Sequence, residues 1–244
     1  MAKSVLTDVR LFAVAADLTG ASNKVEISAE VEEKDTTNYA SQGWKEVIGG
    51  LASSEITGEG QWEAGDPGRV DDASWDQLGG LGPWSICPDG AAVGNLAYFT
   101  RAMRATYEQS GGVGDVAAWK GTATGSWPLV RGEVAHPPGS PQTATGTGTA
   151  LQLGAVDAGE RLFAALHVLS AAGTTPSITA RVESDDAQAF STPTTRLTFD
   201  AASGPGGQIL RTDGTAVADT WWRVAWTITG TTPSFMFVST LGIR

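Results

Sequence analysis

The chain has 244 residues, a formal net charge of −11 at pH 7 and a sequence pI near 4.5. This acidity argues against tight binding to nucleic acid, because few cations are available to displace counterions from a phosphate backbone. The single cysteine, Cys87, excludes an intrachain disulfide framework. The sequence has no apolar run of about 18 residues and no secretory leader, so we expect no membrane association.

The first feature along the chain is an internal similarity. Residues 10–41 align without a gap with residues 161–192, from Arg10/Arg161 through Glu32/Glu183 to Asp35/Asp186. Because the segment recurs only once, and at a long distance along the chain, the similarity indicates domain duplication rather than the short repeats of a solenoid. We therefore predict an all-β chain of two tandem sandwich or barrel domains, at 1–131 and 154–244, joined by a linker at 132–153.

Both aligned segments alternate apolar and polar residues, which is typical of β-strands with one buried face. The buried face is predicted to carry Val25, Ile27, Ala29 and Val31 in the first segment, and Ile178, Ala180 and Val182 in the second. The opposite, wet face is predicted to carry the candidate site residues Glu26, Glu30, Glu32 and Glu183. Turn-forming residues at 19–23 and 171–177 predict that each copy begins with a β-hairpin, at 10–32 and 161–183.

Further strands are predicted at 54–63, 96–107, 195–199, 221–229 and 235–241, with a closing hairpin at 230–233. One short helix is predicted at 71–78, because Asp71 or Asp72 can cap its first amides and Gly79 can end it. The segment 132–153 is rich in Pro, Thr and Gly, which favours an extended linker or, alternatively, an arm lying on a neighbouring molecule.

Residues suited to catalysis are few. His167 lies within a predicted strand, where a structural hydrogen bond is the favoured interpretation, and His136 precedes two prolines in the predicted linker. Carboxylates at 30–35 and 183–186 lack the spacing of a calcium loop and are better explained as solvated strand ends. We expect no catalytic site, no metal and no cofactor.

Nine tryptophans leave one alternative function open. Exposed indole rings on a β-sandwich would suit a glycan-binding module of a tail-tip or secreted protein. Trp222 and Trp226 alternate with Val224 on one strand face, however, which favours a core or subunit contact.

Several stretches resemble the major tail (tail tube) proteins of long-tailed bacteriophages, particularly those of actinobacterial hosts. They are SNKVEISAEVEEKDTTNYASQGWKEVIGGL, EGQWEAG, RLFAALHVLS, SITARVESDD, TTRLTF and WWRVAWTITGTTPSFMF, and the likeness extends from about Leu6 to Ile243. The resemblance implies a β-sandwich or partly closed barrel with a flanking helix, assembled into stacked rings that form a conduit for double-stranded DNA. The second copy departs from this pattern because no helix is predicted in it.

Together, the resemblance and the internal similarity predict a non-enzymatic virion protein. If each chain supplied two units, three chains could form a ring of six units, so a homotrimer is expected. The expected partners are other copies, the tape measure and tail terminator proteins and, in transit, DNA, with assembly in the host cytoplasm. Carboxylates lining the channel would keep DNA from adhering, and Glu26, Glu30, Glu32 and Glu183 are the candidates for that lining or for a subunit contact.

Overall fold

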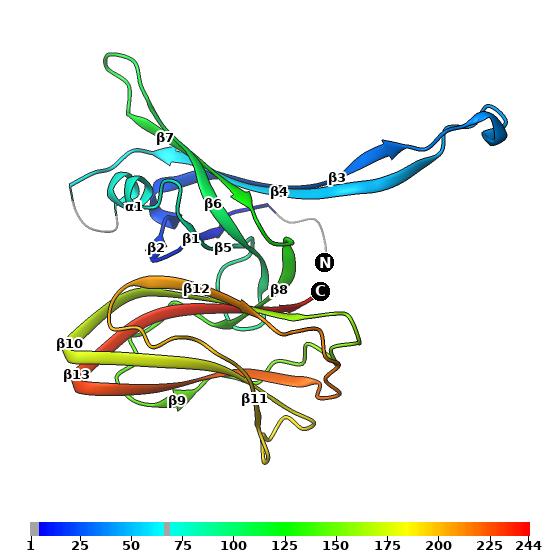
Figure 1. The fold of residues 1–244 in the computed structure, drawn as a ribbon. Coiled ribbons are helices and arrows are strands. Elements are labelled where there is room, and N and C mark those ends of the chain that lie inside the picture. The colour runs from blue at the N-terminus through cyan, green and yellow to red at the C-terminus, as the bar shows by residue number, and fades with distance from the viewer. Residues whose placement is uncertain (1–4, 66–68) are drawn as a thin grey trace.

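Strands account for most of the chain in the computed structural model, which describes residues 5–65 and 69–244 (Figure 1). The all-β prediction is therefore confirmed. The strands are β1 Arg10–Ala13, β2 Ala16–Asp17, β3 Ser22–Asp35, β4 Val47–Gln61, β5 Leu81–Cys87, β6 Leu96–Ser110, β7 Ala118–Gly125, β8 Val130–His136, β9 Gly146–Thr147, β10 Leu162–Asp185, β11 Thr194–Thr198, β12 Gly206–Arg211 and β13 Trp221–Ile243. The helical elements are η1 Thr19–Ala21, η2 Tyr39–Ser41 and α1 Val70–Asp76.

The N-terminal half is an antiparallel sheet that curls around one apolar cluster. Its strands pair in the order β3-β4-β7-β6-β5-β1-β2. Residues from several of these strands, among them Leu11, Ile56, Trp84 and Trp119, are buried together inside the curl. In the described chain β3 pairs only with β4, so the curl is not closed between β3 and β1. This arrangement agrees with the expected partly closed barrel.

The predicted helix is confirmed as α1, at Val70–Asp76. Asp71 and Asp72 lie in its first turn, and Gly79, with φ of 77°, follows its end. The Asp71 carboxylate accepts a hydrogen bond of 3.0 Å from Trp62 Nε1, which ties the helix to the sheet. Within the described residues, no helix is long and apolar enough to cross a membrane.

The C-terminal half is built on two long paired strands, β10 and β13. β11 and β12 extend the sheet from β10, while β8 and β9 extend it from β13. A second apolar cluster fills this half, with Val182, Trp222, Val224 and Phe237 among its fully buried members. The predicted burial of Ile178, Ala180 and Val182 is confirmed.

The two halves are joined through β8 and a buried histidine. β8 pairs with β6 of the first half and with β13 of the second. His167 on β10 contacts the first half at two points, Ser85 Oγ at 2.8 Å and the carbonyl oxygen of Val14 at 2.9 Å. Because a carbonyl can only accept, His167 Nδ1 carries the proton and Nε2 accepts from the Ser85 hydroxyl. The structural role predicted for His167 is confirmed.

The segment 132–153 is an ordered part of this fold. β8 runs through its start to His136, and the segment then follows β13 through β9 and through bridges from Gln142 to Phe235 and from Leu151 to Trp222. His136 is accordingly buried and stacks on Phe237, with ring centroids 3.9 Å apart. The division of the chain into domains at 1–131 and 154–244 stays a prediction.

The two aligned segments have different structures, so the predicted matching hairpins are wrong. In residues 10–32, β1 pairs with β2 and β5, whereas β3 pairs with β4. In residues 161–183, both ends of β10 pair with β13 and not with each other. Gly173 and Thr175 have positive φ, and the pairing of β10 with β13 shifts its register there and then continues. The internal duplication is not confirmed.

The hairpin predicted at 230–233 is also wrong, for the same reason. The segments 221–229 and 235–241 belong to one strand, β13, which pairs along its length with β10. Gly230 and Thr232 have positive φ opposite Gly173 and Thr175, so both strands are irregular at the same level. The turn-forming residues therefore mark the irregular positions in β10 and β13 correctly. The two strands remain paired on both sides of these positions.

Candidate assembly and channel surface

One face of the strands β3, β4, β7 and β6 is polar over most of its width, and the exposed Met103 on β6, which is paired with Thr124, is its apolar exception. Directly paired residues share a face of a sheet, so the pairing register assembles three rows on it. The rows are Lys24-Glu59-Lys120-Glu108, Glu26-Thr57-Thr122-Thr106 and Ser28-Glu55-Thr124. We call these residues the polar face. With four carboxylates and two ammonium groups, it carries a net negative charge.

The opposite face of the same strands is apolar, which explains why the sequence folds this way locally. Ile56 and Ala123, which alternate with the polar residues, are fully buried, and Trp119 is 2% exposed. Gly58 lies where a Cβ atom would come within 2.8 Å of the Trp119 ring and 2.9 Å of Leu11. A larger residue there would disturb the core. The sequence Ile56-Thr57-Gly58-Glu59 therefore places small or apolar groups inward and polar groups outward.

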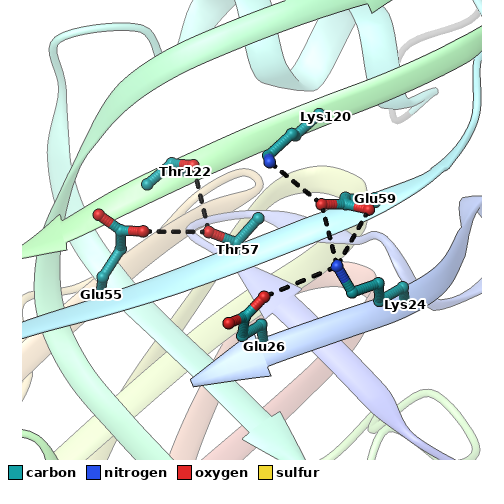
Figure 2. Close-up of polar contacts among 7 residues, drawn as sticks. All are labelled: Lys24, Glu26, Glu55, Thr57, Glu59, Lys120 and Thr122. Carbon is teal, nitrogen blue, oxygen red and sulfur yellow. Dashed lines mark hydrogen bonds and ion pairs between the residues drawn. The ribbon is translucent and has the colours of Figure 1, made fainter. Parts of the chain in front are cut away.

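Hydrogen bonds and ion pairs link neighbouring side chains on the polar face (Figure 2). Glu59 Oε1 lies 3.2 Å from Lys120 Nζ and 3.4 Å from Lys24 Nζ, and Lys24 Nζ is also 3.7 Å from Glu26. The hydrogen bond from Lys120 lowers the pKa of Glu59, and the same contact raises the pKa of Lys120. Both lysines therefore have carboxylate neighbours on this face, which offset their positive charge.

Hydroxyl groups cover the next row of the polar face. Thr57 Oγ1 lies 3.2 Å from Thr122 Oγ1 and donates to Glu55 Oε1 at 3.4 Å. Thr57 itself is buried, at 7% exposed, whereas Thr122 is half-buried and Glu55 is exposed, so this row presents hydroxyl and carboxylate groups and no cation. The face is therefore suited to contact solvent or a hydrated polyanion rather than to bind one.

The four predicted site residues do not lie together. Glu26 lies on the polar face, and Glu30 and Glu32 are exposed further along β3. Glu183 lies in the other half on β10, where it is 5% exposed. Arg181 and Arg223 both contact its carboxylate at 2.7 Å. Burial alone would raise the pKa of Glu183, but hydrogen bonds from the two arginines hold it below its ordinary value. The prediction that Glu183 faces solvent is wrong, because its partners on β10 and β13 enclose it.

Sequence reasoning missed most of the polar face. Glu55, Thr57 and Glu59 alternate with Ile56 and Gly58, and that pattern could have identified them. Lys120 and Thr122 could not have been placed beside them, since the pairing of β4 with β7 joins segments far apart in the chain.

Beyond the polar face, the hairpin of β3 and β4 projects from the body of the molecule as an arm, defined here as residues 30–52 (Figure 1). At its tip Asn38 caps η2 by accepting a hydrogen bond from the Ala40 amide at 2.8 Å. Large apolar side chains on the arm are exposed, including Val31 at 60%, Trp44 at 81% and Leu51 at 82%. The prediction that Ala29 and Val31 are buried is wrong, because both are exposed where β3 leaves the body of the molecule. Exposed apolar groups gathered in this way mark an interaction surface.

A second assembly feature is the open edge of β3. A cavity of about 730 Å³ lies between this strand and residues 6–11, with Val25, Ile27 and Leu11 among its lining residues. An unpaired strand edge presents backbone groups that another chain can pair with. Strands β3 and β4 thus carry the open edge, the arm and part of the polar face.

The remaining candidates for chemistry are structural. Cys87 is buried, and burial raises the pKa of its thiol to about 12, so the reactive thiolate is disfavoured. Trp222 and Trp226 are in the core, as predicted, and cannot serve as a glycan platform. In the described ranges, no group of three or more His, Cys, Asp or Glu side chains is arranged to hold a metal ion.

Comparison with known proteins identifies no family. No family model matches the chain, and no curated protein matches it. Similar solved structures include the tail of an empty gene transfer agent particle, with 22% identity, a TM-score of 0.40 and coverage of 50% of this chain and 91% of that one. The SPP1 tail tube has 14% identity, a TM-score of 0.41 and coverage of 51% and 76%.

A third similar structure is SPP1 Dit, described as a hub adsorption apparatus protein of phages that infect Gram-positive bacteria. It has 9% identity and a TM-score of 0.35, and the match covers 98% of this chain and 100% of that one. These neighbours are tail and tail-hub proteins. Because TM-scores below 0.5 do not establish a common fold, the function of this chain has to be inferred from its own residues and geometry.

Proposed function

We propose that the chain is a structural protein of a phage-type tail, which assembles with other copies into stacked rings whose channel lets double-stranded DNA pass. The observation that carries this proposal is the polar face. It is a wide, acidic, hydroxyl-rich sheet surface whose lysines are already paired, on strands that also carry an open edge and an exposed apolar arm. The sequence resemblance to tail tube proteins supports the same role.

In this role the polar face lines the channel. Double-stranded DNA binds proteins mainly by exchanging its counterions for lysine and arginine side chains. The lysines of this face, Lys24 and Lys120, are held by Glu26 and Glu59. A hydrated, net negative lining would let DNA pass without adhering.

The arm and the open edge of β3 supply the contacts between copies. Pairing across an open edge satisfies backbone groups, and burial of apolar side chains on the arm provides the driving force for association. Other tail components, such as tape measure and terminator proteins, would meet the inner surface and the end of the tube. Assembly would take place in the host cytoplasm, and the product would belong to the virion tail.

The expected three-chain ring rested on two equivalent units in each chain. The segments 10–41 and 161–192 differ in structure, which removes the argument for two equivalent units in one chain. We accordingly propose that a ring of six units takes six chains. Native mass measurement of isolated rings decides between three and six.

The channel role is tested by charge reversal on the polar face. E26K/E55K/E108K replaces three carboxylates of this face by lysines, so assembled tubes of this variant should retain double-stranded DNA at low salt and release it as salt rises. A matched control, D157K/E160K/D200K, changes the net charge equally at exposed positions of the other half. Equal retention by both variants would contradict the channel assignment, because it would reflect net charge alone.

A further inference from the structure

Six arginines in the described part of this acidic chain take part in no ion pair: Arg104, which lies over the Trp84 ring, Arg131, which is exposed, and four others. The sequence has 27 acidic and 16 basic residues. Yet Arg101, Arg161, Arg211 and Arg244 take part in no ion pair within the described ranges, although every lysine described there does. Where carboxylates are in excess, unpaired guanidinium groups that gather at one place point to an acidic partner from outside the chain.

Two of these four arginines, Arg101 and Arg211, lie over the ring of Trp127, in the loop between β7 and β8. The guanidinium carbon of Arg211 lies 4.5 Å from the centre of the indole ring, and that of Arg101 lies 5.4 Å from it. These distances are within cation–π range, so the indole holds both groups in place. Phe163 meets the same ring edge-on at 6.1 Å, which fixes the ring in turn.

The other two arginines are held by backbone atoms beside the same loop. Arg161 Nη1 donates to the carbonyl of Thr212 at 2.8 Å, next to Arg211. Arg161 and Arg244 are paired through their backbones at 2.7 and 3.0 Å, and the Arg244 side chain donates to the carbonyl of Leu129. We call the four residues the Trp127 arginine cluster. Among the described residues, Arg161 and Arg244 each donate one side-chain hydrogen bond, and Arg101 and Arg211 are positioned by the indole ring.

An apolar cavity borders the cluster. It has a volume of about 290 Å³, and its lining includes Trp127, Leu129 and Arg244 together with Val31 and Ala52 at the base of the arm. A ligand that combines carboxylates with apolar side chains would therefore match both parts of this surface.

The arm combines these two properties. Its carboxylates are Glu30, Glu32, Glu33, Asp35 and Glu46, against the two lysines Lys34 and Lys45. Its exposed apolar side chains include Trp44, Ile48 and Leu51. The arm of the same chain cannot fill the site, since its distal part points away from the body (Figure 1) and none of its carboxylates pairs with the cluster.

We propose that the Trp127 arginine cluster is the docking site for the acidic arm of a second copy of this chain. The inference rests on the proposed self-assembly and names the surface that receives the arm. Arginine suits this task because its planar fork can bind a carboxylate through two hydrogen bonds. The contact is directional, with an arm on one copy and a receptor on the next, so it can repeat from copy to copy.

The test uses charge reversal of the full-length chain. R101E/R211E places carboxylates opposite the incoming arm and should reduce the sedimentable, assembled fraction at least tenfold. R131E is the matched control for the single reversals R101E and R211E, because Arg131 is exposed and also lacks an ion pair in the described ranges but does not contact Trp127. R131E should assemble like the wild type. If R101E/R211E does not melt cooperatively, R101Q/R211Q takes its place, with a smaller loss expected.

A complementary arm variant, E33R/E46R, distinguishes docking from a general effect of charge. Alone, it should also assemble poorly, because its arm repels the wild-type cluster. Mixed in equal amounts with R101E/R211E, it should restore assembly, since each arm then meets a cluster of opposite charge. No recovery in the mixture would overturn the proposal, as would full assembly of R101E/R211E alone.

Two further outcomes separate this inference from the proposed function. If the wild type itself never forms rings or tubes, the proposed function fails, and the docking site fails with it. If the wild type assembles but also binds double-stranded DNA at low salt, and R101E/R211E abolishes only the DNA binding, the cluster is a nucleic-acid site and the docking proposal is wrong.

Discussion

Val31 and Val182 occupy equivalent positions in two segments of similar sequence, and their surroundings are opposite. Val31 on β3 is 60% exposed, whereas Val182 on β10 is fully buried. Val182 is paired with Val224 on β13 and Leu197 on β11, inside the larger apolar cluster. Val31 is paired with Ala52 on an arm that projects from the body (Figure 1). Whether a strand residue is buried thus depends on which other segments pack over that face of the sheet. Val31 stays exposed on the arm, where another molecule can cover it.

The largest expected effect contrasts these two valines directly. Val182→Asp buries an unpaired carboxylate and should destabilise the fold by about 4 kcal/mol or more, enough to abolish soluble, folded protein. Val31→Asp should change the free energy of unfolding of the isolated chain by less than about 0.5 kcal/mol. Thermal melts of dilute protein measure both. A soluble Val182→Asp variant with an unchanged melting temperature would show that β10 is packed differently.

A smaller effect is expected from His167, which links the buried strand β10 to the first half. Burial lowers the pKa of His167 to about 4, from an ordinary value of 6.5. The unfolded chain therefore binds a proton more readily, so the stability due to the neutral ring is fully present above pH 6.5 and is lost as the pH falls towards 4. The loss should be on the order of 3 kcal/mol, about half of it between pH 6.5 and 5.

Denaturant titrations across this pH range, compared with those of His167→Gln, measure that contribution. The variant should show a flatter dependence of stability on pH between 6.5 and 5. His136→Gln is the control for the second histidine, whose pKa burial also lowers. An unchanged pH dependence in His167→Gln would mean that His167 is not buried as a neutral ring in solution.

The smallest effects compare another aligned pair, Glu32 and Glu183. Glu183→Gln removes the charge that Arg181 and Arg223 share in a largely enclosed site, and should cost about 1–2 kcal/mol. Glu32→Gln removes only an exposed pair with Lys34 and should cost less than about 0.5 kcal/mol. Urea unfolding resolves the difference, and equal costs would place both carboxylates in similar surroundings.

Local features of the fold could be predicted from the sequence, because they depend on neighbouring residues. Period-two alternation located β6, β11 and most of β13, and the acidic first turn with Gly79 located α1. Burial of Trp222, Val224 and Trp226 followed from their spacing on one strand.

Pairing between distant segments could not be predicted in this way. Turn-forming residues at 171–177 and 230–233 suggested two hairpins, but β10 and β13 pair with each other through both irregular points. The same limit applies to the candidate site. Glu26 was placed on a wet face correctly, whereas Glu183 was not, since nothing near it in the sequence shows that Arg223 lies across the sheet.

The most direct test of the proposed tail role is a cryo-electron microscopy reconstruction of the purified protein after it has been concentrated to promote assembly. We predict stacked rings around an open channel, with Glu26, Glu55, Glu59 and Thr122 lining it and the arms reaching neighbouring copies. Rings in which this face lies on the outer wall, or a protein that stays monomeric at every concentration, would contradict the account.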